Sequence, residues 1–111
     1  GVIKKSPEPT TILKTVSEVF SVKLSAIKGE RRKKDVVTPR HLAMYLLRAD
    51  AGLPLEEIGV LFGGRDHTTV MHAVEKITSQ LPNDERLRGS LTEVRKRIDT
   101  VFPQSVENAV D

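Results

Sequence analysis

Cysteine and tryptophan are both missing from this chain of 111 residues. Without cysteine there is no disulfide, no thiolate zinc site and no cysteine nucleophile, and a cysteine-free chain suits a reducing compartment. No apolar run approaches the roughly 20 residues that a membrane span needs, and the opening residues GVIKKSPEP lack the apolar block of a signal peptide. We therefore expect a protein without a membrane span that works in the cytoplasm.

Two motifs of catalytic and nucleotide-binding proteins are also missing. The chain has no G-x-x-x-x-G-K-[ST] loop for ATP and no H-E-x-x-H pair for zinc. His67 and His72 are five residues apart and lie off one helical face, and the other candidate ligands of a metal site are His41 and Asp66. The pair Gly63-Gly64 could cradle a nucleotide phosphate, yet no suitable lysine or preceding strand accompanies it. We expect no enzyme activity, no cofactor and no metal in this chain.

Positive charge is unevenly distributed along the sequence. The net charge is +3, but residues 23–48 carry eight basic side chains against Glu30 and Asp35, a local charge of +6 that leaves −3 for the rest. The binding of a polyanion depends more on where the positive charges lie than on the net charge of the chain. A charge cluster can also be a solvated face, so the neighbouring motifs have to decide. The basic side chains are those of Lys23, Lys28, Arg31, Arg32, Lys33, Lys34, Arg40 and Arg48.

Helical periodicity and turn signals indicate one all-α domain, a compact fold of about five to six helices. Residues 1–9 read as a linker end, 10–102 as the folded domain and 103–111 as a flexible tail. One helix is expected to start at Thr10 or Thr11 and another at Thr38-Pro39, because threonine caps a helix and proline suits its first turn. Between them an apolar patch meets Gly29, and a basic loop runs over residues 30–37. Further helices are expected over 55–62, over 66–80 and from Leu87 to Val101.

A short helix, a break containing glycine and a longer helix form the outline of a helix-turn-helix at 55–62, 63–65 and 66–80. Many helical proteins contain such pairs for packing only. Here the second helix opens with short polar side chains, the kind that a recognition helix presents to the major groove. Aspartate accepts a hydrogen bond from cytosine, a threonine methyl or histidine ring packs on thymine, and hydroxyls and amides bind phosphate. Helix capping alone accounts for Asp66 or Thr68 but needs neither His67 nor Thr69.

The basic loop supplies the second half of a DNA-binding mechanism, since phosphate neutralisation provides most non-specific affinity. An arginine in such a loop can enter a narrow A·T minor groove, and Arg31 and Arg32 are the candidates. Arg40 and His41, in the expected first turn of their helix, and Arg65 in the turn are candidates for the phosphate backbone. Each of these side chains could instead simply face solvent. The predicted DNA-binding residues are Arg31, Arg32, Lys33, Lys34, Arg40, His41, Arg65, Asp66, His67, Thr68 and Thr69.

The segment GVLFGGRDHTTVMHAVEKI resembles the signature of the carboxyl-terminal DNA-binding domain of the DnaA family, the bacterial chromosomal replication initiators. The segment TPRHLAMYLLR extends the resemblance, which covers residues 10 to 100. It implies that residues 10–102 form a helix-turn-helix domain that binds A·T-rich boxes such as TTATNCACA at the origin, in initiation and regulation of replication. The ATP of the family is then expected only in an upstream domain of a full-length member.

The resemblance also implies roles for individual residues. Two positions depart from the family pattern: His41 stands where many members have glutamine, and Glu56 stands where many have proline, which here is Pro54. A proline contact to thymine is therefore not expected, and we expect Glu56 either to turn away from phosphate or to alter the preference at one base. The implied base contacts are those of Asp66, His67 and Thr68, the implied phosphate contacts those of Arg40, His41 and Thr69, and the implied minor-groove reader is Arg32.

The expected partner is double-stranded DNA, bound by a domain that is monomeric in isolation and associated with the nucleoid. The alternative is a protein-interaction module whose basic loop docks on an acidic partner, and regulatory proteins that meet this domain would make both interpretations true. A salt titration separates them, because specific DNA binding weakens steeply with salt and still retains its preference for a cognate site.

Overall fold

The computed structural model describes residues 6–101. Within that range the chain is entirely helical, which confirms the all-α prediction, and the expected tail at 103–111 lies outside the described residues. Sequence-local signals account for most element types, since the apolar positions recur at helical spacing in each long helix. The elements are α1 (Pro9–Phe20), α2 (Leu24–Lys28), α3 (Lys34–Ala49), α4 (Leu55–Leu61), α5 (His67–Gln80), the 3-10 turn η1 (Leu81–Asn83) and α6 (Glu85–Val101).

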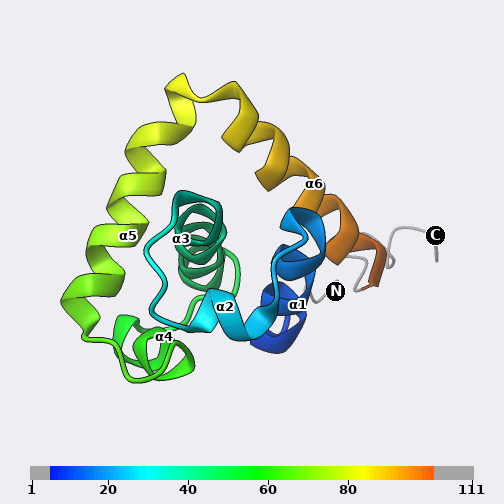
Figure 1. Ribbon diagram of the computed structural model, residues 1–111. Helices are drawn as coiled ribbons and strands as arrows, with labels where there is room; N and C mark the ends of the chain where they lie inside the picture. Colours follow the sequence, from blue (N-terminus) through cyan, green and yellow to red (C-terminus); the bar gives the residue numbers. More distant parts are fainter. Residues whose placement is uncertain (1–5, 102–111) are drawn as a thin grey trace.

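Helix α3 lies at the centre of the molecule. Figure 1 shows it nearly end-on, with α5 on one side, α1 on the other and α6 beyond α1, and α3 contacts α1, α2, α4 and α5. The helix carries a broad apolar stripe that includes Leu42, Leu46 and Leu47, all fully buried. Helix α6, expected as the last helix, packs on α1 through side chains such as Val94. The recognition-type pair α4 and α5 is therefore mounted on a core that α3 organises.

Helix α3 begins at Lys34, four residues before the expected start at Thr38. The threonine does not cap it: the N-cap is Lys33, without a side-chain hydrogen bond, and Pro39 lies inside the helix. The early start buries Val36, which continues the inward stripe one turn toward the amino end. The local signal at Thr38-Pro39 was therefore misleading, and the basic loop is shortened to residues 30–33.

The amino-terminal region contains one element that the sequence pattern does not predict. The apolar patch before Gly29 forms the five-residue helix α2, with Ile27 buried. Helix α1 begins at Pro9 with Glu8 as its N-cap and no side-chain cap, so the expected threonine cap is wrong as well. These differences matter for function because α2 ends where the basic loop begins.

Candidate nucleic-acid interface

Helices α4 and α5 form a tight helix-turn-helix. The carbonyl of Gly59 accepts hydrogen bonds from the amides of Phe62, Gly64 and Arg65 at 3.1, 3.0 and 2.9 Å. Gly63 and Gly64 both have φ near +80°, at 79° and 82°, a conformation that side chains other than glycine's rarely adopt. The turn of residues 62–66 is thus folded back against α4, and it fixes the point from which α5 departs.

The amino-terminal tip of α5 projects out of the core. Asp66 is the N-cap, its carboxylate accepts a hydrogen bond from the amide of Thr68 at 3.3 Å, and the side chains of Asp66 and His67 are 66% and 56% exposed. Hydrogen bonding from Thr68 lowers the pKa of Asp66, so the carboxylate is charged at neutral pH. Thr69 is exposed and Val70 is fully buried, so the helix turns inward immediately after the tip. Helix capping explains the presence of Asp66 at this position. The side chains of His67 and Thr69 have no capping role and are available to a ligand.

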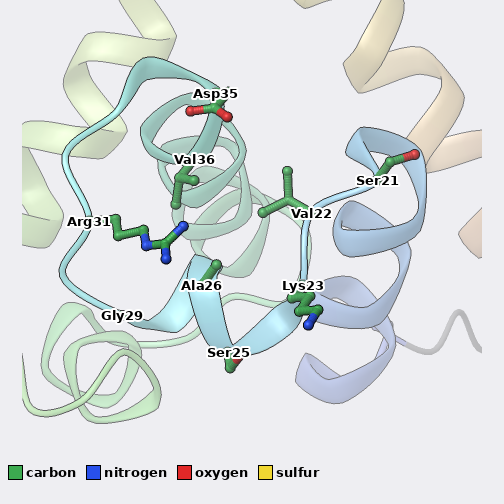
Figure 2. Close-up of a pocket in the computed structure, with 9 residues that line it drawn as sticks. All are labelled: Ser21, Val22, Lys23, Ser25, Ala26, Gly29, Arg31, Asp35 and Val36. Carbon is green, nitrogen blue, oxygen red and sulfur yellow. The ribbon is translucent and has the colours of Figure 1, made fainter.

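Arg31 and Arg32, the two loop arginines, lie on different sides of the basic loop. Arg31 lines a hollow formed with α2 and the start of α3, and Figure 2 shows its guanidinium reaching across the end of α2 toward Ala26 and Val36. Arg32 lines a second hollow on the α5 side, together with Arg65 and Thr69. Arg32 therefore shares a hollow with the start of α5, whereas the hollow that Arg31 lines lies beside α2. The first hollow is lined by Ser21, Val22, Lys23, Ser25, Ala26, Gly29, Arg31, Asp35 and Val36.

Arg40 is not placed where the sequence suggested. The side chain is 4% exposed, and its guanidinium donates to the carbonyls of Ala26, Ile27 and Arg31 at 3.0, 2.7 and 2.7 Å. Because α3 starts at Lys34, residue 40 falls in the second turn instead of the first and faces the carboxyl end of α2. The last carbonyls of a helix lack the usual helical donors, and here the guanidinium binds that of Ile27 and also that of Ala26, which accepts the Gly29 amide at 3.1 Å as well. The structure therefore shows a buried Arg40 bound to backbone carbonyls, and the predicted exposed, phosphate-facing side chain is wrong.

Arg65 is half-buried and also binds backbone carbonyls. One terminal nitrogen donates to Lys28 and Phe62 at 3.5 and 3.3 Å, and the other donates to Gly29. The residue precedes Asp66 directly, so one side chain spans from the turn to the end of α2. The sequence pattern predicts a solvent-facing or phosphate-facing Arg65 and contains no sign of this contact.

His41 is half-buried within a positively charged environment. Burial, and after it the positive charges of Lys76, Arg40 and Arg65, together lower its pKa to about 4. The imidazole is therefore neutral at pH 7, able to donate one hydrogen bond without carrying charge.

This shifted pKa predicts a pH-dependent stability. The folded pKa lies below the unfolded value near 6.5, so the neutral form stabilises the fold above pH 6.5 and this contribution is lost as the pH falls toward 4. Since the ring is only half-buried, we expect a loss of about 1 kcal/mol in the free energy of unfolding, measured by urea titration at pH 7 and pH 4.5. His41→Gln should flatten the dependence, and His72→Gln, at an exposed position, should leave it unchanged. An unaltered slope in His41→Gln would refute the assignment.

Two residues that the sequence pattern does not single out extend the basic side of the interface. Lys76 and Gln80 of α5 line a hollow with Arg32, Lys34 and His41. The signal was present in the helical spacing, because Lys76 lies seven residues after Thr69 and therefore on the same face of α5. Basic and polar groups thus run from the α5 tip along one face to the start of α3.

Across residues 6–101, no group of three or more His, Asp or Glu side chains is placed to hold a metal ion. In the same part of the chain, none of the helices has the length and apolar character required to cross a bilayer.

Comparisons with known proteins converge on one family. The family described as "Bacterial dnaA protein helix-turn-helix" matches residues 9–77. The chain is 45% identical over 95 residues to the chromosomal replication initiator protein DnaA of Roseiflexus castenholzii, covering 86% of this chain and 20% of that protein. It is 44% identical over 89 residues to the DnaA of Thermus thermophilus, covering 80% of this chain and 20% of that protein.

A solved structure agrees with these relatives. The crystal structure of a DNA replication initiation factor superposes with a TM-score of 0.69 and 26% identity, over 85% of this chain and 30% of the other. The chain spans about a fifth of the length of the curated relatives it matches.

Proposed function

Because this chain belongs to the bacterial DnaA helix-turn-helix family, we propose that it binds double-stranded DNA sequence-specifically, at DnaA-box sites of the TTATNCACA type. The relatives are named chromosomal replication initiators. The proposed setting is therefore the initiation and regulation of chromosome replication at the nucleoid, in the cytoplasm. The domain would bind as a monomer to each box, and regulatory proteins are further proposed partners.

The observation that carries this proposal is that the two groups proposed to recognise the DNA sequence lie on one side of the molecule. The exposed tip of α5 and the loop residue Arg32 lie on the same side of the molecule, because Arg32, Arg65 and Thr69 line one hollow. A duplex placed against that side would receive α5 in its major groove and Arg32 in the adjacent minor groove, as helix-turn-helix proteins with basic arms do.

In the major groove, the tip of α5 would read base edges. The Asp66 carboxylate is charged and exposed, so it can accept a hydrogen bond from the amino group of cytosine. His67 and Thr68 would contact neighbouring bases through a ring edge and a methyl group. Asp66 accepts its capping bond from the Thr68 amide through one oxygen, and its other oxygen lies 3.4 Å from Nδ1 of His67, on side chains that are both more than half exposed.

The phosphate backbone would be bound by groups around the same hollows. Thr69 and neutral His41 are proposed as hydrogen-bond donors, and Lys33 and Lys34 as charge. Arg31 faces the other side of the loop, so its contribution is proposed to be long-range charge only. Arg40, being buried, is proposed to support the loop without contacting DNA. Glu56 is exposed in the first turn of α4, consistent with a side chain that turns toward solvent.

Fluorescence-anisotropy competition between a labelled TTATNCACA duplex and its scramble tests the proposal. We expect a preference of about a thousandfold or more for the box, together with a steep loss of affinity for both duplexes as salt rises. Asp66→Asn keeps a good N-cap and removes the carboxylate, so its loss of preference, of about 1–3 kcal/mol, would report base reading and not helix fraying. Thr68→Ala should behave similarly.

The matched control is Asp84→Asn, at the other aspartate that caps a helix through a backbone amide, the Leu87 N–H. This variant should discriminate as well as the parent. Equal affinity of the parent chain for box and scramble would overturn the proposed function.

A further inference from the structure

Two guanidinium groups from separate parts of the fold bind one short stretch of backbone. Arg40 of α3 donates to the carbonyls of Ala26, Ile27 and Arg31. Arg65 of the turn donates to the carbonyls of Lys28 and Gly29, directly between them. Together the two side chains take five carbonyls within residues 26–31, which is the end of α2 and the first half of the basic loop.

The loop has few other attachments. Within the described chain, no backbone–backbone hydrogen bond involves residues 30–32, while Lys33 is already part of the start of α3 through bonds to Val36 and Val37 at 2.9 Å. Residues 30–33 are exposed, so burial does not hold them either. The position of Arg32 is therefore set by the guanidinium contacts on one side and by α3 on the other.

Of the two arginines, Arg65 also belongs to the helix-turn-helix. Its amide donates to the Gly59 carbonyl at 2.9 Å, which fixes its backbone against α4, and the next residue, Asp66, caps α5. Its side chain reaches Phe62 in the turn and Gly29 before the loop with the same planar group. A lysine has the charge but lacks the fork that binds several carbonyls at once.

We propose that Arg65 is a positioning residue that couples the two DNA readers. It holds the basic loop against the helix-turn-helix, so that Arg32 enters the minor groove while the tip of α5 occupies the major groove. This inference rests on the proposed function. A positioning role can be distinguished from a phosphate contact by measurement. Loss of a phosphate contact would weaken the affinity for every sequence alike and would add to the loss caused by Arg32→Ala. Loss of a positioning residue acts through Arg32, so it would add nothing once Arg32 has been removed.

A double-mutant cycle on the whole 111-residue chain tests the coupling. Affinities of the parent, Arg32→Ala, Arg65→Lys and the double variant are measured for the box and for a duplex whose A·T half carries G·C pairs. We expect Arg32→Ala to reduce the A·T preference about tenfold, the cost of one misread base pair. Arg65→Lys should cause most of the same reduction, and the double variant should be no worse than Arg32→Ala.

The matched control is Arg48→Lys, because Arg48 also donates to a carbonyl, that of Leu53 at 3.0 Å, but at the far end of α3. It should leave the A·T preference unchanged. A second measurement without DNA, amide hydrogen exchange followed by NMR, should show faster exchange in Arg65→Lys at Ile27 and Gly29, whose amides donate to the carbonyls of Lys23 and Ala26 at 3.0 and 3.1 Å. The centre of α5 should stay as well protected as in the parent.

The outcomes are distinguishable. Additive effects of Arg32→Ala and Arg65→Lys, or unchanged exchange at Ile27 and Gly29, would overturn the coupling and leave the proposed function intact. An Arg32→Ala variant with undiminished A·T preference would overturn both minor-groove reading and the coupling, while the preference for box over scramble would still report on the major groove. If the parent chain showed no preference for the box over its scramble, the proposed function itself would be overturned.

Discussion

Gly59→Ala is expected to lower the free energy of unfolding by about 2–3 kcal/mol, as overpacking of a tight site does. A Cβ at this position would lie 2.1 Å from the carbonyl oxygen of Arg65 and 3.2 Å from its carbonyl carbon. The atoms that must move are backbone atoms, and the Gly59 carbonyl is itself bonded to three amides of the turn. The turn would therefore have to separate from α4, and urea unfolding followed by circular dichroism measures the cost.

The control for this variant is Gly89→Ala in the middle of α6. Gly89 is exposed and a Cβ there would meet no atom within 4 Å, so the alanine should stabilise the domain by about 0.5–1 kcal/mol through helix propensity alone. The opposite signs of the two glycine-to-alanine changes are the test. If Gly59→Ala were as stable as the parent chain, the close approach of α4 and the turn would be wrong.

Arg40→Met is expected to cost about 3 kcal/mol of unfolding free energy, since buried carbonyls that lose their donors cost about 1–3 kcal/mol each. Three carbonyls lose a donor, and that of Ile27 is the most deeply enclosed. We expect no larger loss because burial and the neighbouring Arg65 lower the pKa of Arg40. Keeping the guanidinium charged in the folded protein therefore already costs free energy, and the methionine avoids that cost. The measurement is urea unfolding at pH 7.

Arg48→Met serves as the matched comparison, because it removes a single exposed bond between a guanidinium and a carbonyl. Its unfolding free energy should change by less than about 0.5 kcal/mol, as at most surface positions. A role for Arg40 in phosphate binding would produce the reverse pattern in Arg40→Met, with parental stability and weaker binding to every duplex. That pattern would restore the interpretation drawn from the sequence and refute the buried arrangement.

Helix positions with strong local signals were predicted well. The glycine pair after Phe62 has positive φ values and ends α4 within one residue of the predicted boundary, and α5 begins one residue after the predicted Asp66, which is its cap. The signature segment around these residues indicates the same family that the comparison matches over residues 9–77. The candidate tip of the recognition helix follows from the same local pattern, since exposure at a helix start is a property of neighbouring residues.

The start of α3, the helix α2 and the roles of the arginines were not predictable in this way. Thr38-Pro39 is a strong local start signal, yet burial of Val36 against the rest of the core extends the helix past it. That one-turn extension turns Arg40 from an exposed first-turn residue into a buried one. Residue type and local pattern do not distinguish Arg31 from Arg32, which only the family resemblance separates, and the folded backbone places them in different hollows.

The sequence by itself determined that this chain is a helical domain of the DnaA family with a helix-turn-helix, because periodicity, glycine breaks and the signature motif are written in adjacent residues. The tertiary structure alone decided which arginine lies on the α5 side of the loop and which arginines bind the loop's backbone and the end of α2. The reason is that a guanidinium binds the carbonyls that the fold brings to it, and here those lie 9–14 residues away for Arg40 and, apart from that of Phe62, 36–37 residues away for Arg65. No local pattern carries that information, since the packing of separate helices creates it.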